Sequence, residues 1–117
     1  MKSGTDLIND AKARIREVDA TEALRRHTSS GATFLDVRDQ QEVNLGRIPG
    51  AIHISRGTLE TKAEGAIPRD ARLVVYCGSG SRSALAADTL RQMGYTDVCS
   101  LAGGFRAWAE AGGDIDG

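Results

Sequence analysis

The chain has 117 residues, 15 basic and 16 acidic side chains, and a formal net charge of −1. This length is typical of one domain, and the balanced charge gives no electrostatic basis for binding nucleic acid or an anionic membrane. The first residues lack the apolar core of a signal peptide, and no run approaches the roughly 18 apolar residues of a membrane span. We therefore expect a cytoplasmic protein that contacts neither nucleic acid nor membrane.

The chain divides into three segments. The sequence predicts an N-terminal helical extension over residues 1–16, a main domain over residues 17–113 and a frayed tail over residues 114–117. In the extension, apolar residues at a four-residue spacing indicate an amphipathic helix over residues 5–16, with Thr5 as its N-cap. We expect this helix to pack on its own domain.

Within the main domain, segments with strand and helix character alternate. The expected strands cover residues 17–18, 33–38, 51–54, 73–76 and 97–101. The expected helices cover residues 20–27, 59–63 and 84–93, and a last one opens at Gly103. His27, at the end of the first of these helices, is expected on the surface. The alternation predicts a three-layer α/β fold, with a mostly parallel five-stranded sheet and helices on both faces.

The strongest functional signal is a cysteine directly after the apolar strand at residues 73–76. A loop rich in glycine and serine follows Cys77, and its residues are Gly78, Ser79, Gly80, Ser81 and Arg82. The backbone N–H groups of such a turn and the positive end of the next helix dipole both favour an anion. We expect the Cys77 thiol to ionise below its usual pKa of about 8.5 and to act as a nucleophile. The alternative is an ordinary buried cysteine beside a turn, which is the role expected for Cys99.

Charged residues also lie at the end of the strand at residues 33–38. Asp36 and Arg38 lie where it ends, and with Glu42 they are expected to form a structural ion pair that supports the site rather than performing chemistry. His53 is expected to be a structural strand histidine. Three further basic residues are candidates to rim the site, and the sequence does not choose among them; they are Lys62, Arg69 and Arg72.

Three ordered motifs resemble the single-domain rhodaneses, which are thiosulfate-type sulfurtransferases. They are the loop at residues 77–82, the Asp-Val-Arg at 36–38 with the Ile-Pro-Gly-Ala turn at 48–51, and the Gly-Gly-Phe-x-x-Trp at 103–108. Four residues separate Cys77 from Arg82, whereas the related phosphatases and arsenate reductases have five. The shorter loop suits a sulfur atom carried on the cysteine, and the longer one suits a tetrahedral phosphate.

The resemblance implies a rhodanese-like fold and a sulfurtransferase without a metal or organic cofactor. A sulfane sulfur would pass from thiosulfate or a persulfide donor, through a Cys77 persulfide, to a thiol or cyanide acceptor. Arg82 would attract the small anionic donor and help to hold the loop. A sulfur-carrier or thioredoxin-like protein is a further expected partner. The alternatives are a non-catalytic binding or sulfur-relay module, and a phosphatase or arsenate reductase of the same fold.

Overall fold

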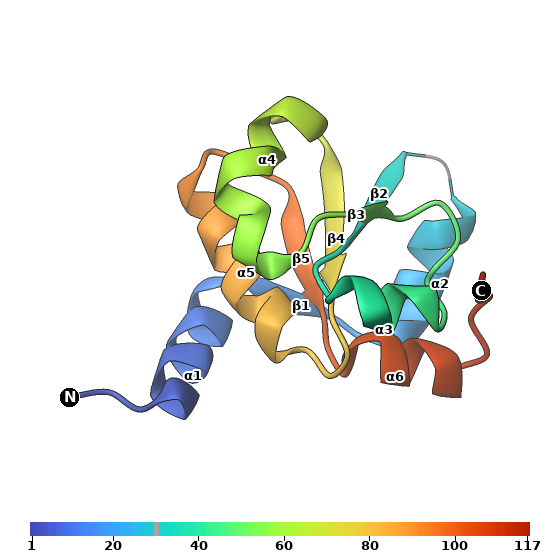
Figure 1. Cartoon of the computed structure of the whole chain (residues 1–117), viewed down its shortest axis with the longest axis horizontal. Coiled ribbons are helices and arrows are strands. Elements are labelled where there is room, and N and C mark those ends of the chain that lie inside the picture. Colours follow the sequence, from blue (N-terminus) through green and yellow to red (C-terminus); the bar gives the residue numbers. More distant parts are fainter. Residues whose placement is uncertain (30) are drawn as a thin grey trace.

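The computed structural model describes residues 1–29 and 31–117, which form one sheet with helices on both of its faces (Figure 1). The helical elements are α1 (Gly4–Arg14), α2 (Ala20–Thr28), α3 (Gln40–Asn44), the 3₁₀ turn η1 (Arg56–Thr58), α4 (Leu59–Ala66), α5 (Ser81–Gln92) and α6 (Gly104–Glu110). The strands are β1 (Arg16–Val18), β2 (Ala32–Asp36), β3 (Ile52–His53), β4 (Arg72–Tyr76) and β5 (Val98–Leu101). The predicted α/β class and five-stranded sheet are confirmed.

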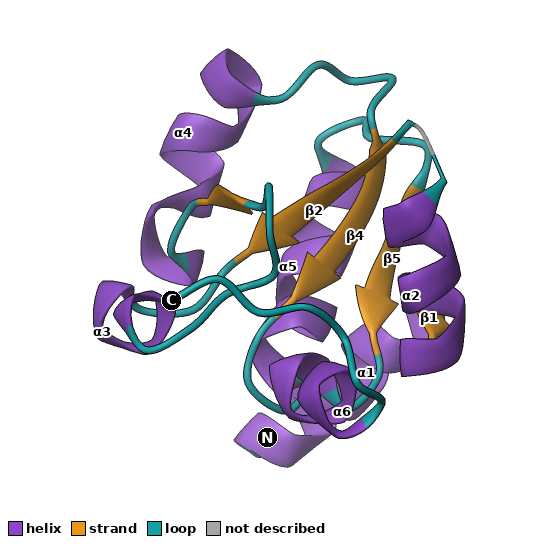
Figure 2. Cartoon of the chain, turned by 90° about the vertical axis from the view of Figure 1, so that its right-hand side faces the viewer, coloured by secondary structure: helices purple, strands orange, loops and turns teal. Residues whose placement is uncertain are grey.

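The sheet is parallel throughout, with the strand order β1-β5-β4-β2-β3, so β4 lies at its centre. Figure 2 shows β2, β4 and β5 side by side, with α4 to one side of them and α2 to the other. Because helices cover both faces, the last four residues of β4 are all buried. The chain leaves β4 at the carboxyl edge of the sheet, where open α/β sheets place their binding sites.

Two apolar cores lie on opposite faces of the sheet. The first, beneath α4 and α5, includes Leu35, Leu59, Val75, Leu90 and Tyr95. The second, beneath α2 and α6, includes Ala23, Phe34, Val74, Tyr76 and Trp108. Alternate side chains of β4 enter the two cores, as the period of a strand requires. Packing from both faces therefore fixes the position of Cys77, which directly follows this strand.

The N-terminal helix packs against α5. It is capped by Ser3, not by the expected Thr5, and it ends two residues before the predicted boundary at Arg16. The earlier end has a clear cause, because the chain is already extended where β1 pairs with β5. A bidentate ion pair at 2.8 Å joins Arg14, in the last turn of α1, to Asp88 on α5.

The last residues of the chain, expected to fray, are tied to the domain. Arg47 and Asp116 form an antiparallel bridge with two backbone hydrogen bonds of 2.9 Å. The indole N–H of Trp108 donates a hydrogen bond of 2.8 Å to the carbonyl of Asp114. The prediction of a frayed tail was wrong because these partners lie far from the tail in the sequence.

Some local predictions also differ from the structure. His27, expected on the surface, is half-buried, with its ring 5.2 Å from those of both Phe34 and Trp108. Its Nε2 lies 2.9 Å from the carbonyl oxygen of Pro49. The five-residue helix α3 was not predicted, because so short an element shows no apolar periodicity. Among the described residues, no helix combines the length and apolar character that crossing a membrane requires.

Candidate active site

Cys77 lies between the end of β4 and the start of α5. Its thiol is 1% exposed and faces the N-terminal end of α5, a helix of 12 residues. Gly80 caps this helix with φ +106°, in the left-handed region that favours glycine. A Cβ at Gly80 would also lie 3.3 Å from the backbone nitrogen of Gly103. The positive φ and the close approach of Gly103 together explain why position 80 is a glycine.

Two groups, one in the loop and one in the first turn of α5, contact the sulfur directly. The backbone N–H of Gly80 donates a hydrogen bond to Sγ of Cys77 at 3.1 Å. The hydroxyl oxygen of Ser83 lies 3.5 Å from Sγ, and Oγ of Ser100 lies 2.8 Å behind it. Ser83 and Ser100 are both fully buried, so the three side chains form a short polar chain inside the core. Its geometry lets Ser100 donate to Ser83 while Ser83 donates to an ionised sulfur.

The environment lowers the pKa of the Cys77 thiol below its ordinary value. Burial, the largest single influence, raises this pKa because it penalises the thiolate. Hydrogen bonds from the Ser83 hydroxyl and from the backbone N–H groups of Ser83, Gly80 and Ser79 together lower it by more. The loop therefore favours the ionised form of a buried thiol.

Arg82, the one cation of the loop, forms a bidentate ion pair with Glu42. The two N···O distances are 2.7 and 3.0 Å. The guanidinium holds the pKa of Glu42 at about 2, so the pair stays ionised at neutral pH. Glu42 was expected to pair with Asp36 and Arg38 instead, and that part of the prediction was wrong. The pair joins α3 to the first turn of α5, above Gly78.

Asp36 and Arg38 form a buried ion pair of their own beside the loop. Their closest N···O distance is 2.7 Å, and their side chains are 1% and 5% exposed. Arg38 also donates to the carbonyl of Gly46 at 2.7 Å and stacks 4.4 Å from the ring centre of Phe105. It thereby ties the end of β2 to the chain before β3 and to α6. These contacts are compatible with the supporting role expected for this pair, which stays a prediction.

The start of α6 packs directly on the loop. The N–H of Phe105 donates to the carbonyl of Cys77 at 2.7 Å, and that of Arg106 donates to the carbonyl of Gly78 at 3.2 Å. A Cβ at Gly104 would lie 2.5 Å from the Cys77 carbonyl oxygen, so only glycine allows this approach. The glycine at this position thus lets α6 approach the cysteine loop closely.

Other residues singled out in the sequence lie elsewhere. Arg72 opens β4 at the opposite edge of the sheet, and Arg69 donates to the carbonyl of Met93 just after α5, at 2.8 Å. Neither rims the loop, whereas the role suggested for Lys62 stays a prediction. His53 is held in β3, with Nε2 2.7 Å from the Arg38 carbonyl oxygen. Cys99 is buried, and burial raises the pKa of its thiol.

Ser100, one member of the polar chain, was not predicted from the sequence. A signal was present, since Ser100 is the one hydroxyl residue in a strand whose four residues are all buried. Buried polar groups are almost always hydrogen-bonded, so an internal partner was to be expected. The pairing of Glu42 with Arg82 had no such signal, because 40 residues separate them.

The parallel sheet and the turn around Cys77 define an α/β domain in which a loop of backbone N–H donors surrounds a cysteine. The family model described as rhodanese-like domain matches residues 19–111, and the chain belongs to this family. The thiosulfate sulfurtransferase GlpE of Pseudomonas paraeruginosa is 40% identical over 89 residues, which are 76% of this chain and 80% of that protein. A sulfurtransferase of Allochromatium vinosum is 34% identical over 99 residues, covering 84% of this chain and 92% of that one.

Two further similarities bear on the range of possible functions. A putative sulfur carrier protein of Bacillus subtilis, YrkF, is 30% identical and covers 92% of this chain, which spans 58% of that protein. A solved structure from Rhodopseudomonas palustris, described as a protein of unknown function and possible tyrosine phosphatase, has a TM-score of 0.91. It is 34% identical and covers 99% of this chain and 96% of its own.

Proposed function

We propose that this protein is a sulfurtransferase that carries a sulfane sulfur on Cys77. The observation that carries the proposal is the N–H of Gly80 directed at Sγ of Cys77, 3.1 Å away, in a turn that lowers the pKa of the thiol. A thiolate is the nucleophilic form of cysteine, so no separate general base is needed to activate it. The names of the sulfurtransferase relatives support the same chemistry.

In the first step, the Cys77 thiolate attacks the outer sulfur of thiosulfate. A new S–S bond forms to Cys77, the S–S bond of thiosulfate breaks, and sulfite leaves with that electron pair. The terminal sulfur of the persulfide carries the negative charge. Hydrogen-bond donors of the loop, with Gly80 foremost, would stabilise this charge as they stabilise the thiolate.

In the second step, an acceptor thiolate or cyanide attacks the terminal sulfur. The bond to Cys77 breaks, the electron pair returns to its Sγ, and the product is a persulfide or thiocyanate. No electron is supplied from outside, so the cycle is a double displacement through a covalent intermediate. A persulfide on a carrier protein would enter the same cycle, and the similarity to a putative sulfur carrier supports that donor class. A reducing compartment such as the cytoplasm would keep Cys77 and Cys99 free for this chemistry.

Phosphoester hydrolysis is a second candidate, because one similar structure is described as a possible tyrosine phosphatase. It would need a loop that surrounds a tetrahedral phosphate. Here four residues lie between Cys77 and Arg82, and Arg82 is engaged by Glu42. Both features favour sulfur transfer over phosphate chemistry.

Steady-state kinetics on three forms of the protein test the proposal. The wild type and Cys99→Ala should form thiocyanate from thiosulfate and cyanide at similar rates, whereas Cys77→Ser should be inactive. None of the three should hydrolyse p-nitrophenyl phosphate. Activity that survives in Cys77→Ser, or phosphatase activity without sulfur transfer from thiosulfate or a protein persulfide, would reject the proposed function.

A further inference from the structure

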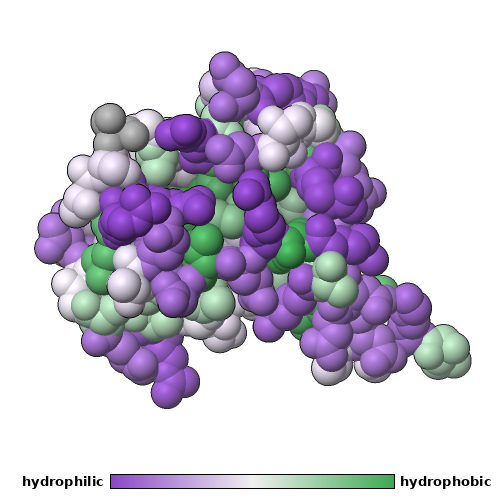
Figure 3. Space-filling view, turned by 180° about the vertical axis from the view of Figure 1, so that it is seen from behind, coloured by the Kyte–Doolittle hydropathy of each residue, from purple (hydrophilic) through white to green (hydrophobic). Residues whose placement is uncertain are grey.

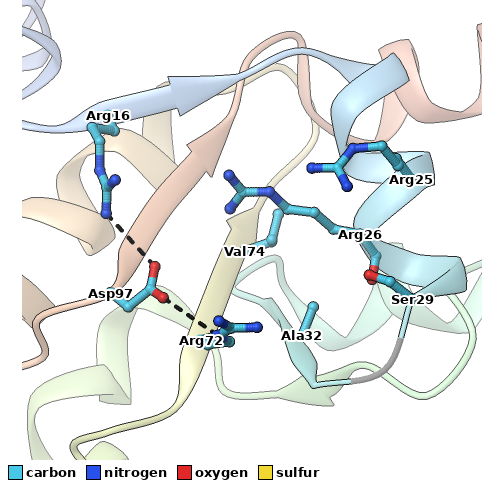
Figure 4. A pocket seen from close by; sticks show the side chains of 8 residues that line it. All are labelled: Arg16, Arg25, Arg26, Ser29, Ala32, Arg72, Val74 and Asp97. Atoms are coloured by element: carbon cyan, nitrogen blue, oxygen red, sulfur yellow. Dashed lines mark hydrogen bonds and ion pairs between the residues drawn. The ribbon is translucent and has the colours of Figure 1, made fainter.

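A cavity of about 310 Å³ lies at the amino edge of the sheet, at the opposite end from Cys77. Residues from α2 and from the starts of several strands line it; they are Arg16, Arg25, Arg26, Ser29, Ala32, Arg72, Val74 and Asp97 (Figure 4). Arg72 and Cys77 are five positions apart along β4 and its end, a span of about 16 Å for an extended strand. The cavity is therefore separate from the cysteine loop.

Four of the lining residues are arginines, and one is acidic. The surface in Figure 3 is mainly hydrophilic, with hydrophobic residues visible only in patches between polar ones. The arginines come from three elements: Arg16 opens β1, Arg72 opens β4, and Arg25 and Arg26 lie in the last turn of α2. The helix dipole favours cations at a helix C-terminus, which accounts for the two arginines of α2. It does not account for the two arginines on strands. Their convergence leaves an excess of positive charge around one hollow.

The arginines on α2 are fixed in position by a single carboxylate. Glu22 accepts hydrogen bonds from Nε of Arg25 at 2.9 Å and from Nε of Arg26 at 2.8 Å. Arg26 also reaches Sγ of Cys99 with Nη1, at 3.5 Å. In Figure 4 the guanidinium groups of both residues extend from α2 toward the strands. Each keeps unused N–H donors, since Glu22 occupies only one edge of the fork.

The strand arginines are held loosely. Their ion pairs with Asp97 are 3.6 Å for Arg16 and 3.8 Å for Arg72, longer than hydrogen bonds, and both side chains are 70% exposed. Over the described ranges 1–29 and 31–117, no hydrogen bond engages either guanidinium. Asp97 is one carboxylate between two cations, so donors remain available to a second anion. Guanidinium groups bind tetrahedral oxyanions through paired N–H···O bonds.

We propose that this cavity binds a multiply charged tetrahedral oxyanion, such as the phosphate groups of a small molecule or a sulfur oxyanion. The fixed arginines of α2 would form one wall, and Arg16 and Arg72 would turn from Asp97 to complete the other. The volume is at the lower end of the roughly 300–1,000 Å³ of small-molecule sites, which suits two linked tetrahedral groups. The site does not depend on Cys77, so it is a second ligand site on the protein.

Isothermal titration at constant low ionic strength tests the proposal, with inorganic pyrophosphate and sulfate as probes. Saturable binding of one ion is expected, and Arg16→Gln and Arg72→Gln should each weaken it about tenfold through loss of a charge-assisted contact. Lys62→Gln removes one exposed charge on α4, away from the cavity, and should leave the affinity unchanged. Cys77→Ser should bind as the wild type does, which separates this site from the sulfur-transfer site.

The two probes distinguish the source of the ligand. Tighter binding of pyrophosphate is expected from its greater charge and would assign the cavity to phosphorylated molecules, whereas tighter binding of sulfate would assign it to sulfur oxyanions. The proposal is overturned if neither pyrophosphate nor sulfate shows saturable binding. An equal loss of affinity in Lys62→Gln would also overturn it, because it would show that only the overall charge matters.

Discussion

Arg82 and Glu42 are joined by two hydrogen bonds across the top of the cysteine loop, so the one cation of the loop is paired with a carboxylate. Their side chains are 38% and 36% exposed, and a pair this exposed contributes only about 0–1 kcal/mol to stability. The pair has a larger effect on the charge of the site, because the carboxylate of Glu42 offsets the positive charge of Arg82. Under the proposed function, a dianionic donor such as thiosulfate would meet Arg82 together with the negative charge of Glu42.

Glu42→Gln should therefore improve the use of thiosulfate. Removing one negative charge changes the interaction energy of the site with a dianion by about 1 kcal/mol at about 8 Å in water, or roughly fivefold in binding. We expect the KM for thiosulfate to fall severalfold at low ionic strength while kcat changes little. Glu60→Gln, which removes a carboxylate of α4 that pairs with Arg56 in η1, is the matched control. A raised KM would show instead that the pair acts by holding the loop in place.

The hydroxyl of Ser83 should control the ionisation of Cys77. The pKa of this thiol is lowered, so its thiolate should appear at a lower pH than that of a free cysteine, and the rate of persulfide formation should rise with it. Ser83→Ala should raise the pKa and slow the reaction at neutral pH about tenfold, the effect of losing ~1.5 kcal/mol from a hydrogen bond to a charge. Ultraviolet absorbance of the thiolate as a function of pH measures the pKa of Cys77 in the wild type and in Ser83→Ala.

The lowered pKa of Cys77 also predicts how the free energy of unfolding depends on pH. A lowered pKa in the folded state means that the thiolate stabilises the fold fully above the unfolded pKa and that this contribution disappears as the pH falls through the folded value. The free energy of unfolding of wild type relative to Cys77→Ser should therefore rise from neutral pH toward about pH 8.5. A flat difference, or one that falls with pH, contradicts the assignment of a lowered pKa.

The buried pair of Asp36 and Arg38 should matter for stability. Asp36→Asn leaves the guanidinium of Arg38 almost completely buried without its countercharge. Breaking such a pair costs about 3–5 kcal/mol, whereas the exposed Glu60→Gln should change the free energy of unfolding by at most about 0.5 kcal/mol. Denaturant unfolding measures both values. A loss below about 1 kcal/mol would show that Arg38 is held mainly by Gly46 and Phe105.

Gly104→Ala should separate α6 from the cysteine loop. The new Cβ would lie 2.5 Å from the carbonyl oxygen of Cys77, at φ +60°. Gly112→Ala is the matched control, because Gly112 has φ +85° but nothing within 4 Å of its Cβ position. The control should lose about 1–2 kcal/mol from backbone strain alone, and Gly104→Ala clearly more, together with most of the activity. Equal losses in the two variants would mean that the close approach at Gly104 is not required.

The fold and the loop around Cys77 could be predicted because their signals are local. An apolar strand, a turn with glycines and a helix follow one another between residues 73 and 92, and each shows a pattern of its own. The contacts that complete the site are not local. Glu42 was assigned to the nearby Asp36 and Arg38, although its partner is Arg82, and Ser100 belongs to a strand that packs beside the loop only in the folded chain. The position of Ser100 in an apolar strand indicates that it has an internal partner, but sequence order does not identify that partner, and it gives no signal at all for the pair of Glu42 and Arg82.

The central claim is that Cys77, and not Cys99, carries the transferred sulfur. Intact mass spectrometry after incubation with thiosulfate or a protein persulfide tests it most directly, with tryptic peptides to locate the added atom. One sulfur, about 32 Da, should be gained by the wild type and by Cys99→Ala and should lie on the peptide that contains Cys77, while Cys77→Ser gains none. An added sulfur on Cys99, or an unmodified Cys77 with every donor, would contradict the account.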